Sequence, residues 1–319
     1  MHRNVNYVAT TIVALCASPL VGAQQHYVFT YFTGNGEDGL HLAHSTDGYS
    51  WAAIAGGRAL LKPEAGDDKL MRDPSIVCGP DGVYHMTWTV SWGERGIGYS
   101  FSPDLIHWEP QRTLPVMDHE PQARNCWAPE LFFDDASQLF YIYWATTIPG
   151  RYSETDGQTR RHADDPGYDH RIYYVATKDF ISFTPAAIAY DHAFNVIDAA
   201  VVRHGEIYVM FLKDETDRPF PPQKNIRLAE GPTAAGPFGP PSGPITGDYW
   251  AEGPSALQVG DRWLVYFDKY RENRFGVVSS TDLAQWTDES DRLVVPRGMR
   301  HGTALAVPEG VAARLLELP

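Results

Sequence analysis

Short apolar runs separated by turn-forming residues make up most of the chain, and the runs are of three recurring kinds. The first kind is nearly all apolar, as in strands buried on both faces, and covers residues 74–78, 130–133, 199–202, 255–259 and 303–307. The second is rich in aromatic and β-branched residues and covers residues 27–32, 84–90, 140–145, 207–212 and 263–267. The third alternates and covers residues 39–43, 96–100, 171–175, 225–229 and 274–278. We therefore predict an all-β fold, with helical periodicity confined to short stretches such as 311–318.

A short motif follows most runs of the third kind, and it repeats along the chain. An aspartate is followed four residues later by an aromatic residue, in the pairs Asp47 and Trp51, Asp104 and Trp108, Asp179 and Phe183, and Asp282 and Trp286. A degenerate fifth copy ends at Phe238. Repeats of about 50 to 75 residues with several strands each are typical of β-propellers. The tryptophans of this motif are expected to be structural.

The order of the runs predicts how the propeller closes. The chain begins with a run of the second kind and ends with one of the first kind. Pairing these two completes a blade and leaves no open sheet edge. We predict one domain over residues 24–319, a five-bladed β-propeller whose first blade is closed by the C-terminal strand. A β-sandwich or two small β domains are the alternatives.

The N-terminal residues 1–23 have the pattern of a secretory signal peptide. Arg3 precedes a largely apolar stretch that ends in the small residues Gly22 and Ala23. We expect cleavage near Ala23 and export to the periplasm or the medium. Cys78 and Cys126 could form a disulfide in such a compartment. Their places on different blades favour two separate thiols instead.

Charge excludes two classes of partner. The 319 residues contain 26 Lys and Arg against 40 Asp and Glu, a net charge of −14. Nucleic acids and anionic membranes would be repelled, so we expect neither as a partner.

Ionisable residues stand at the start of each run of the first kind, where the innermost strands would converge on the axis. They are Asp73, Glu130, Asp198, Glu252 and His301. Carboxylates so close together raise each other's proton affinity and are costly to bury without a partner or a use. Their convergence predicts a functional site at the mouth of the ring.

These motifs resemble glycoside hydrolase family 43 and related five-bladed propeller glycosidases. The resemblance spans nearly the whole chain after residue 23 and is carried by Asp73-Pro74-Ser75-Ile76, Trp127-Ala128-Pro129-Glu130, Ile197-Asp198-Ala199, Glu252-Gly253-Pro254 and Arg300-His301-Gly302. It implies that Asp73 is the general base, Glu252 the general acid, and Asp198 the residue that modulates and orients the acid. It further implies an inverting, exo-acting monomer that removes terminal pentose from plant-type oligo- or polysaccharides.

The sequence departs from the family pattern at two positions. Ala199 stands where proline is usual, and Glu130 where aspartate is common; we interpret Glu130 as a substrate contact or a residue behind the site. Arg72-Asp73-Pro74 also matches a motif of propellers acting on fructosides, but the Asn-Asp-Pro motif of that family is absent from the sequence.

Sugar hydrolysis needs one protonated and one ionised carboxyl group, together with flat apolar surfaces for the sugar. Trp88, Trp92, Trp127 and Trp250 are near the expected mouth, and we expect Trp127 and one other to stack on a sugar. Arg72 is a candidate neighbour of the base. Arg124 and Arg300 either bind hydroxyl groups or neutralise the acids. The long connection 146–170 is either a lid or a solvated insertion.

His301 is the candidate metal contact, because the resemblance implies a structural cation, commonly calcium, near this position. The best-fitting activity is that of an α-L-arabinofuranosidase. A β-xylosidase, a galactofuranosidase, a catalytically silent carbohydrate-binding propeller and a protein-interaction scaffold are the alternatives. The three intact acids argue against the last two.

Overall fold

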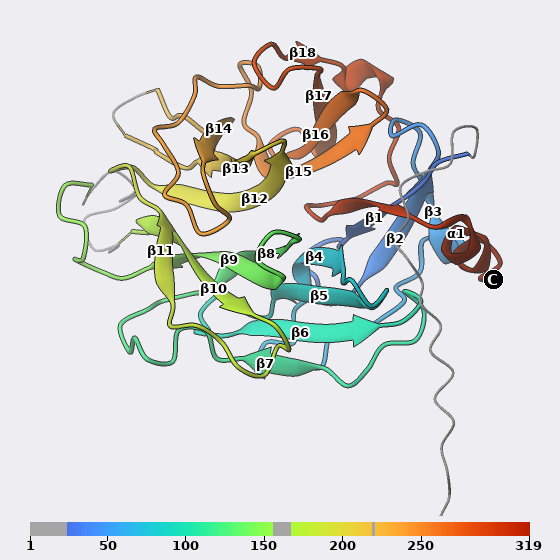
Figure 1. Cartoon of the computed structure of the whole chain (residues 1–319), viewed down its shortest axis with the longest axis horizontal. Coiled ribbons are helices and arrows are strands. Elements are labelled where there is room, and N and C mark those ends of the chain that lie inside the picture. The colour runs from blue at the N-terminus through green and yellow to red at the C-terminus, as the bar shows by residue number, and fades with distance from the viewer. Residues whose placement is uncertain (1–23, 156–166, 219–220) are drawn as a thin grey trace, which may run out of the picture.

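A computed structural model describes residues 24–155, 167–218 and 221–319. Five antiparallel sheets surround a common axis, which confirms the predicted propeller (Figure 1). From the axis outward, blade 1 contains β19 (Ala304–Val307), β1 (His26–Tyr31), β2 (His41–Ser45) and β3 (Ala52–Ala53). Blade 2 contains β4 (Arg72–Cys78), β5 (Tyr84–Thr89), β6 (Ile97–Ser102) and β7 (Arg112–Leu114).

The other three blades repeat this order. Blade 3 contains β8 (Trp127–Asp134), β9 (Leu139–Thr147), β10 (His170–Thr177) and β11 (Ala187–Tyr190). Blade 4 contains β12 (Val196–His204), β13 (Ile207–Asp214) and β14 (Asn225–Gly231), and blade 5 contains β15 (Glu252–Val259), β16 (Arg262–Lys269), β17 (Arg274–Ser280) and β18 (Thr287–Asp288). Two short 3₁₀ helices, Ile54–Gly57 and Ser290–Arg292, and the helix α1 (Glu309–Leu316) complete the elements of the described residues.

The two ends of the described chain close the ring. Strand β19 pairs antiparallel with β1, with Val307 opposite His26 and Ala304 opposite Phe29. The N–H of Thr303 also donates to the hydroxyl of Thr30 at 2.9 Å. The predicted closure is therefore confirmed, and the sandwich alternative is excluded.

The hydrophobic core lies mainly between neighbouring blades. One cluster joins Val28 and Leu42 of blade 1 to Met86 and Trp88 of blade 2, all of them fully or almost fully buried. Helix α1 adds its apolar face, including Leu315, to the same cluster. Burial of this kind is the main favourable contribution to folding.

The repeated aspartate motif is a turn that the side chain stabilises. In the first copy, Asp47 Oδ1 accepts the N–H groups of Tyr49 and Ser50, each at 2.7 Å. Trp51 is buried and packs edge-to-face on Phe29, with ring centroids 5.1 Å apart. The motif is structural, as predicted.

No disulfide joins Cys78 and Cys126, which are both thiols, the first half-buried and the second buried. The predicted signal peptide, residues 1–23, lies outside the described residues. Within the described ranges, no helix is long and apolar enough to cross a membrane.

A β-bulge recurs near the start of four innermost strands, β4, β8, β12 and β15. The pairing with the second strand shifts register between Arg72 and Ser75, Trp127 and Glu130, Ile197 and Ala200, and Glu252 and Ser255. Each bulge contains one residue with positive φ: Asp73 (52°), Ala128 (46°), Asp198 (54°) and Gly253 (62°). Bulges re-aim side chains next to functional sites, and left-handed backbone at non-glycine residues is concentrated there.

The position of each acidic residue relative to the bulge determines how far along the axis its side chain lies. Asp73 and Asp198 occupy the left-handed position of their blades. Glu252 comes one residue before that position in blade 5, and Glu130 comes two residues after it in blade 3. We therefore expect the first three at the mouth of the ring and Glu130 deeper along the axis.

Candidate active site

A cavity of about 440 Å³ opens at the end of the axis where the bulges lie. Its volume is within the range of small-molecule sites. Asp73, Asp198 and Glu252 all line it, together with His301. The other lining residues used below are Arg72, Trp92, Trp127, Lys213, Glu215, Lys224, Trp250, Tyr270, Arg271 and Arg300. Carboxyl groups from three separate blades thus share one cavity.

Asp73 is held as a carboxylate. Its Oδ2 accepts the Thr89 hydroxyl at 2.9 Å, and its Oδ1 is 3.3 Å from His301 Nδ1. Burial alone would raise the pKa of Asp73, but the hydrogen bond and charge of His301, with Arg72 and Thr89, hold it at about 2. Asp73 is therefore ionised at any pH near neutrality.

His301 is the cationic partner of this carboxylate. Burial alone would lower its pKa, but Asp73 above all, together with Asp198 and Glu130, raises the pKa of His301 to about 9. A protonated ring has no nitrogen lone pair for a metal, and calcium prefers oxygen ligands. Among the described residues, no cluster of three or more His, Cys, Asp or Glu side chains is placed to hold a metal. His301 therefore serves Asp73 as an ion-pair partner, and the calcium ion implied by the resemblance stays a prediction.

Asp198 is close enough to both Asp73 and Glu252 to feel their charges. Its Oδ2 accepts the N–H of Gly253 at 2.9 Å, which ties β12 to the bulge of β15. Burial, with the negative charges of Glu252 and Asp73, raises the pKa of Asp198 to about 6 against the opposing charges of His301 and Lys213. A carboxyl group so poised can hold or release a proton near neutral pH.

Glu252 contacts a cation with each of its oxygens. Lys213 Nζ is 2.9 Å from Oε2, and Arg300 Nη2 is 3.2 Å from Oε1. Arg300 also pairs with Asp268, whose pKa is raised to about 6 by burial and by the charge of Glu252, against the charge of Arg300. Arg300 therefore neutralises acids, one of the two roles considered for it, while also lining the cavity.

Lys213, Glu215, Lys224 and Asp268 belong to the site and are missed by motif-based reasoning. Lys213 lies near the end of β13, paired with Ile197, and Asp268 lies near the end of β16, paired with Glu252. Thr89 occupies the matching place opposite Arg72 and binds Asp73. The available signal was a charged residue at the end of a second strand, because that end lies at the same face of the ring as the start of the innermost strand.

Glu130 lies below the cavity, not at its wall. Its Oε2 accepts the Thr303 hydroxyl at 3.3 Å. Burial raises the pKa of Glu130 to about 7, against the hydrogen bonds of Ser75 and Thr303 and the charge of His301. It is a residue behind the site, one of the two roles predicted for it.

An aromatic wall borders the cavity beside blades 2 and 3. Trp92 and Trp127 meet edge-to-face at 5.4 Å, and Trp92 is 47% exposed. The Arg72 guanidinium lies 4.4 Å from the Trp92 ring centre and donates to Asn35 Oδ1 at 2.9 Å. Both tryptophans line the cavity, and their stacking on a sugar stays a prediction.

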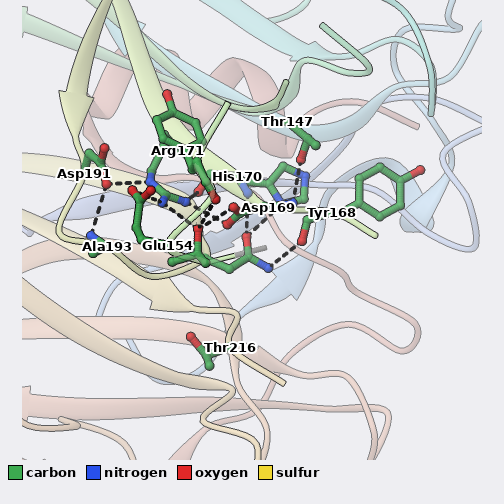
Figure 2. Close-up of polar contacts among 12 residues, drawn as sticks. Thr147, Glu154, Tyr168, Asp169, His170, Arg171, Asp191, Ala193 and Thr216 are labelled. Atoms are coloured by element: carbon green, nitrogen blue, oxygen red, sulfur yellow. Dashed lines mark hydrogen bonds and ion pairs between the residues drawn. The ribbon is translucent and has the colours of Figure 1, made fainter. Parts of the chain in front are cut away.

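A buried polar network supports this wall from behind. Trp127 packs on Tyr168 and His170, at 4.7 and 5.0 Å between ring centres. The next residue, Arg171, is fully buried among the carboxylates of Asp169, Asp191 and Glu154 (Figure 2). The end of the 146–170 connection is therefore anchored beside the cavity. Residues 156–166 of this predicted lid or insertion lie outside the described part of the chain.

Trp250 borders the cavity on the side of blade 5. The Arg271 guanidinium lies 4.9 Å from its ring centre, and Tyr270 packs on it at 5.9 Å. Trp250 is thus part of the cavity lining, as expected.

Two expectations are corrected. Trp88 is fully buried between blades and has no surface to offer a sugar. Its ring fills the space above Gly98, where an added Cβ would be only 2.1 Å from it. Arg124 does not line the cavity; its guanidinium lies over Tyr168 at 4.3 Å and donates to the Gly167 carbonyl.

Gly253 is expected to tolerate no side chain. At φ of 62°, an added Cβ would be 2.3 Å from His301 Cγ, whereas the same addition at Gly260 (φ 63°) meets nothing within 4 Å. Gly253→Ala should therefore lower the free energy of unfolding by about 1–3 kcal/mol more than Gly260→Ala. Urea denaturation of both variants measures the difference, and equal losses would contradict the described contact.

The chain is similar to known proteins in sequence and in fold. Residues 23–310 match the family described as "Probable glycosyl hydrolase domain", which is related to glycoside hydrolase family 43. A protein of Bifidobacterium longum subsp. longum named alpha-L-arabinofuranosidase is 24% identical over 187 residues. That match covers 53% of this chain but only 17% of the relative.

Solved structures share the fold. An alpha-L-arabinofuranosidase from Lactobacillus brevis superposes with a TM-score of 0.52 at 18% identity, covering 69% of this chain and 72% of that one. The catalytic domain of a Coprinopsis cinerea GH62 alpha-L-arabinofuranosidase superposes with a TM-score of 0.50 at 14% identity, covering 74% and 76%. With the family match over nearly the whole described chain, the chain belongs to the glycosyl hydrolase domain family related to glycoside hydrolase family 43.

Proposed function

We propose that this protein is an exported, inverting exo-glycosidase that removes terminal α-L-arabinofuranosyl residues from plant-type oligo- or polysaccharides. The observation that carries the proposal is the gathering of Asp73, Asp198 and Glu252 around one cavity. The name of the Bifidobacterium longum relative supports the choice of sugar. The pattern of residues 1–23 supports export.

Asp73 acts as the general base in this proposal. It is ionised because its pKa is about 2, and its carboxylate faces the cavity. It takes a proton from a water molecule, which attacks the anomeric carbon from the side opposite the leaving group. His301 and Thr89 fix the orientation of the carboxylate during this step.

Glu252 acts as the general acid and gives its proton to the departing glycosidic oxygen. Asp198 orients Glu252 through the Gly253 N–H and supplies a neighbouring carboxyl group that ionises near pH 6. After the reaction the two contacting cations, Lys213 and Arg300, stabilise the carboxylate of Glu252.

The exo mode is supported by the floor of the cavity. Below it, Glu130 and Thr303 meet near the axis. The Ser75 and Ser255 hydroxyls accept N–H groups of the neighbouring blades, from Leu131 and Ala304, each at 2.9 Å. A cavity of this volume suits the end of a sugar chain.

Hydrolysis of a panel of 4-nitrophenyl glycosides tests the proposal. We expect release of nitrophenol from the α-L-arabinofuranoside in preference to the β-D-xyloside and the β-D-galactofuranoside. Proton NMR of the first product should show the inverted anomer. Retention of configuration, or intact glycosides after prolonged incubation, would overturn it, whereas preference for another sugar would replace only the assigned substrate.

A further inference from the structure

One buried lysine joins the proposed acid to a second carboxylate. Lys213 is 1% exposed, and its Nζ is 2.9 Å from Glu252 Oε2 and 2.6 Å from Glu215 Oε2. Burial alone would lower the pKa of Lys213, but Glu215 and Glu252 raise it well above its ordinary value. The ammonium group therefore stays charged between two acids.

Glu215 is itself shared with a second buried lysine. Its Oε1 is 2.6 Å from Lys224 Nζ, which also contacts Asp217 at 3.0 Å. The ion pairs thus run without interruption from Asp217 through Lys224, Glu215 and Lys213 to Glu252. A change of charge at Glu215 must alter how strongly Lys213 acts on Glu252.

A general acid has to hold a proton before the reaction and release it during the reaction. A cation in contact favours the carboxylate, so it strengthens the acid but narrows the pH range in which the acid is protonated. Glu215 competes with Glu252 for the same ammonium group and weakens this effect.

We propose that Lys213 is a positioning residue that sets the upper pH limit at which Glu252 can act as an acid, and that Glu215 moderates it. This inference rests on the proposed role of Glu252. It adds two residues that no sequence motif marks.

Other charged groups also face Glu252. Arg300 contacts it from the segment before β19. Asp198 and Asp268, on β12 and β16, and Tyr270, directly after β16, are close enough to feel its charge. His301 acts on it indirectly, through Asp198 and Asp268. Lys213 and Glu215 form a pair whose separate removal should act on Glu252 in opposite directions.

The test is the pH profile of kcat/KM on a phenyl glycoside, whose poor leaving group requires the acid. In Lys213→Met the alkaline limb should move up by about one pH unit, because the Glu252 carboxyl group then lacks the contacting ammonium group. In Glu215→Gln it should move down by about half a unit, because Lys213 then acts on Glu252 alone. Lys213→Arg, which keeps the charge, should restore the limb of the unsubstituted protein.

Lys269→Met is the matched control, since Lys269 pairs with Glu272 at 3.2 Å and does not line the cavity. Its limb should stay in place. Limbs that do not move, or that move in the same direction in both variants, would overturn the inference while the proposed function stands. If Lys213→Met fails to fold, the downward shift in Glu215→Gln decides. Absence of hydrolysis by the unsubstituted protein would instead reject the proposed function.

Discussion

Asp73→Asn should lower kcat by about a thousandfold on every glycoside that the protein hydrolyses. Asparagine has nearly the same size and can still accept the Thr89 hydroxyl, but it cannot take a proton from water. The loss should not depend on the leaving group, because the base is needed however readily the leaving group departs. Initial rates on a series of aryl glycosides measure it.

The same variant has a second readout that does not depend on turnover. Asp73 makes the largest contribution that raises the pKa of His301 to about 9. In Asp73→Asn this pKa should therefore fall, as NMR titration of the His301 ring would show. Near-normal activity would contradict the assignment of Asp73 as the base, and an unchanged His301 pKa would contradict the described ion pair.

The loss of kcat in Glu252→Gln should depend on the leaving group of the substrate. For an oligosaccharide, whose leaving oxygen needs a proton, we expect kcat to fall by about a thousandfold. For a 2,4-dinitrophenyl glycoside, whose leaving group departs as a stable anion, the loss should be much smaller. Comparison of the two rates for the variant and the unsubstituted protein measures the contribution of the acid.

Asp73→Asn serves as the matched comparison for this prediction, because its loss should be equally large on both substrates. Equal losses in Glu252→Gln would mean that Glu252 does not donate the proton. The carboxyl groups of Asp198 and Asp268, whose pKa values are both raised to about 6, would then be the next candidates.

The strand order was predictable because each kind of strand has its own local pattern. The innermost strands contain short, mostly apolar runs, and the aspartate turn marks the end of the third strand in four of the five blades. Closure of the ring was predictable because the chain begins with a run of the second kind and ends with a run of the first kind, and the two together complete one blade. These patterns involve residues that are close together in the sequence, so they can be recognised without knowing the tertiary contacts.

The side-chain partners of the site were less predictable. The prediction for Trp88 was wrong because neighbouring residues of a strand point to opposite faces of the sheet. Thr89 points toward Asp73, so Trp88 points into the core. Lys213 and Asp268 were missed because their importance comes from cross-strand register. Motifs locate the acids, whereas register and bulges decide which cations meet them.

The pairing of β19 with β1 has a consequence for when the protein can become active. Arg300 and His301, which hold Glu252 and Asp73, stand directly before β19, the strand that completes blade 1. Until that segment docks on β1, four blades and part of a fifth can be present without these two cations of the site. A nascent or truncated chain ending before residue 300 should therefore be inert toward sugars even where most of its sheets have formed.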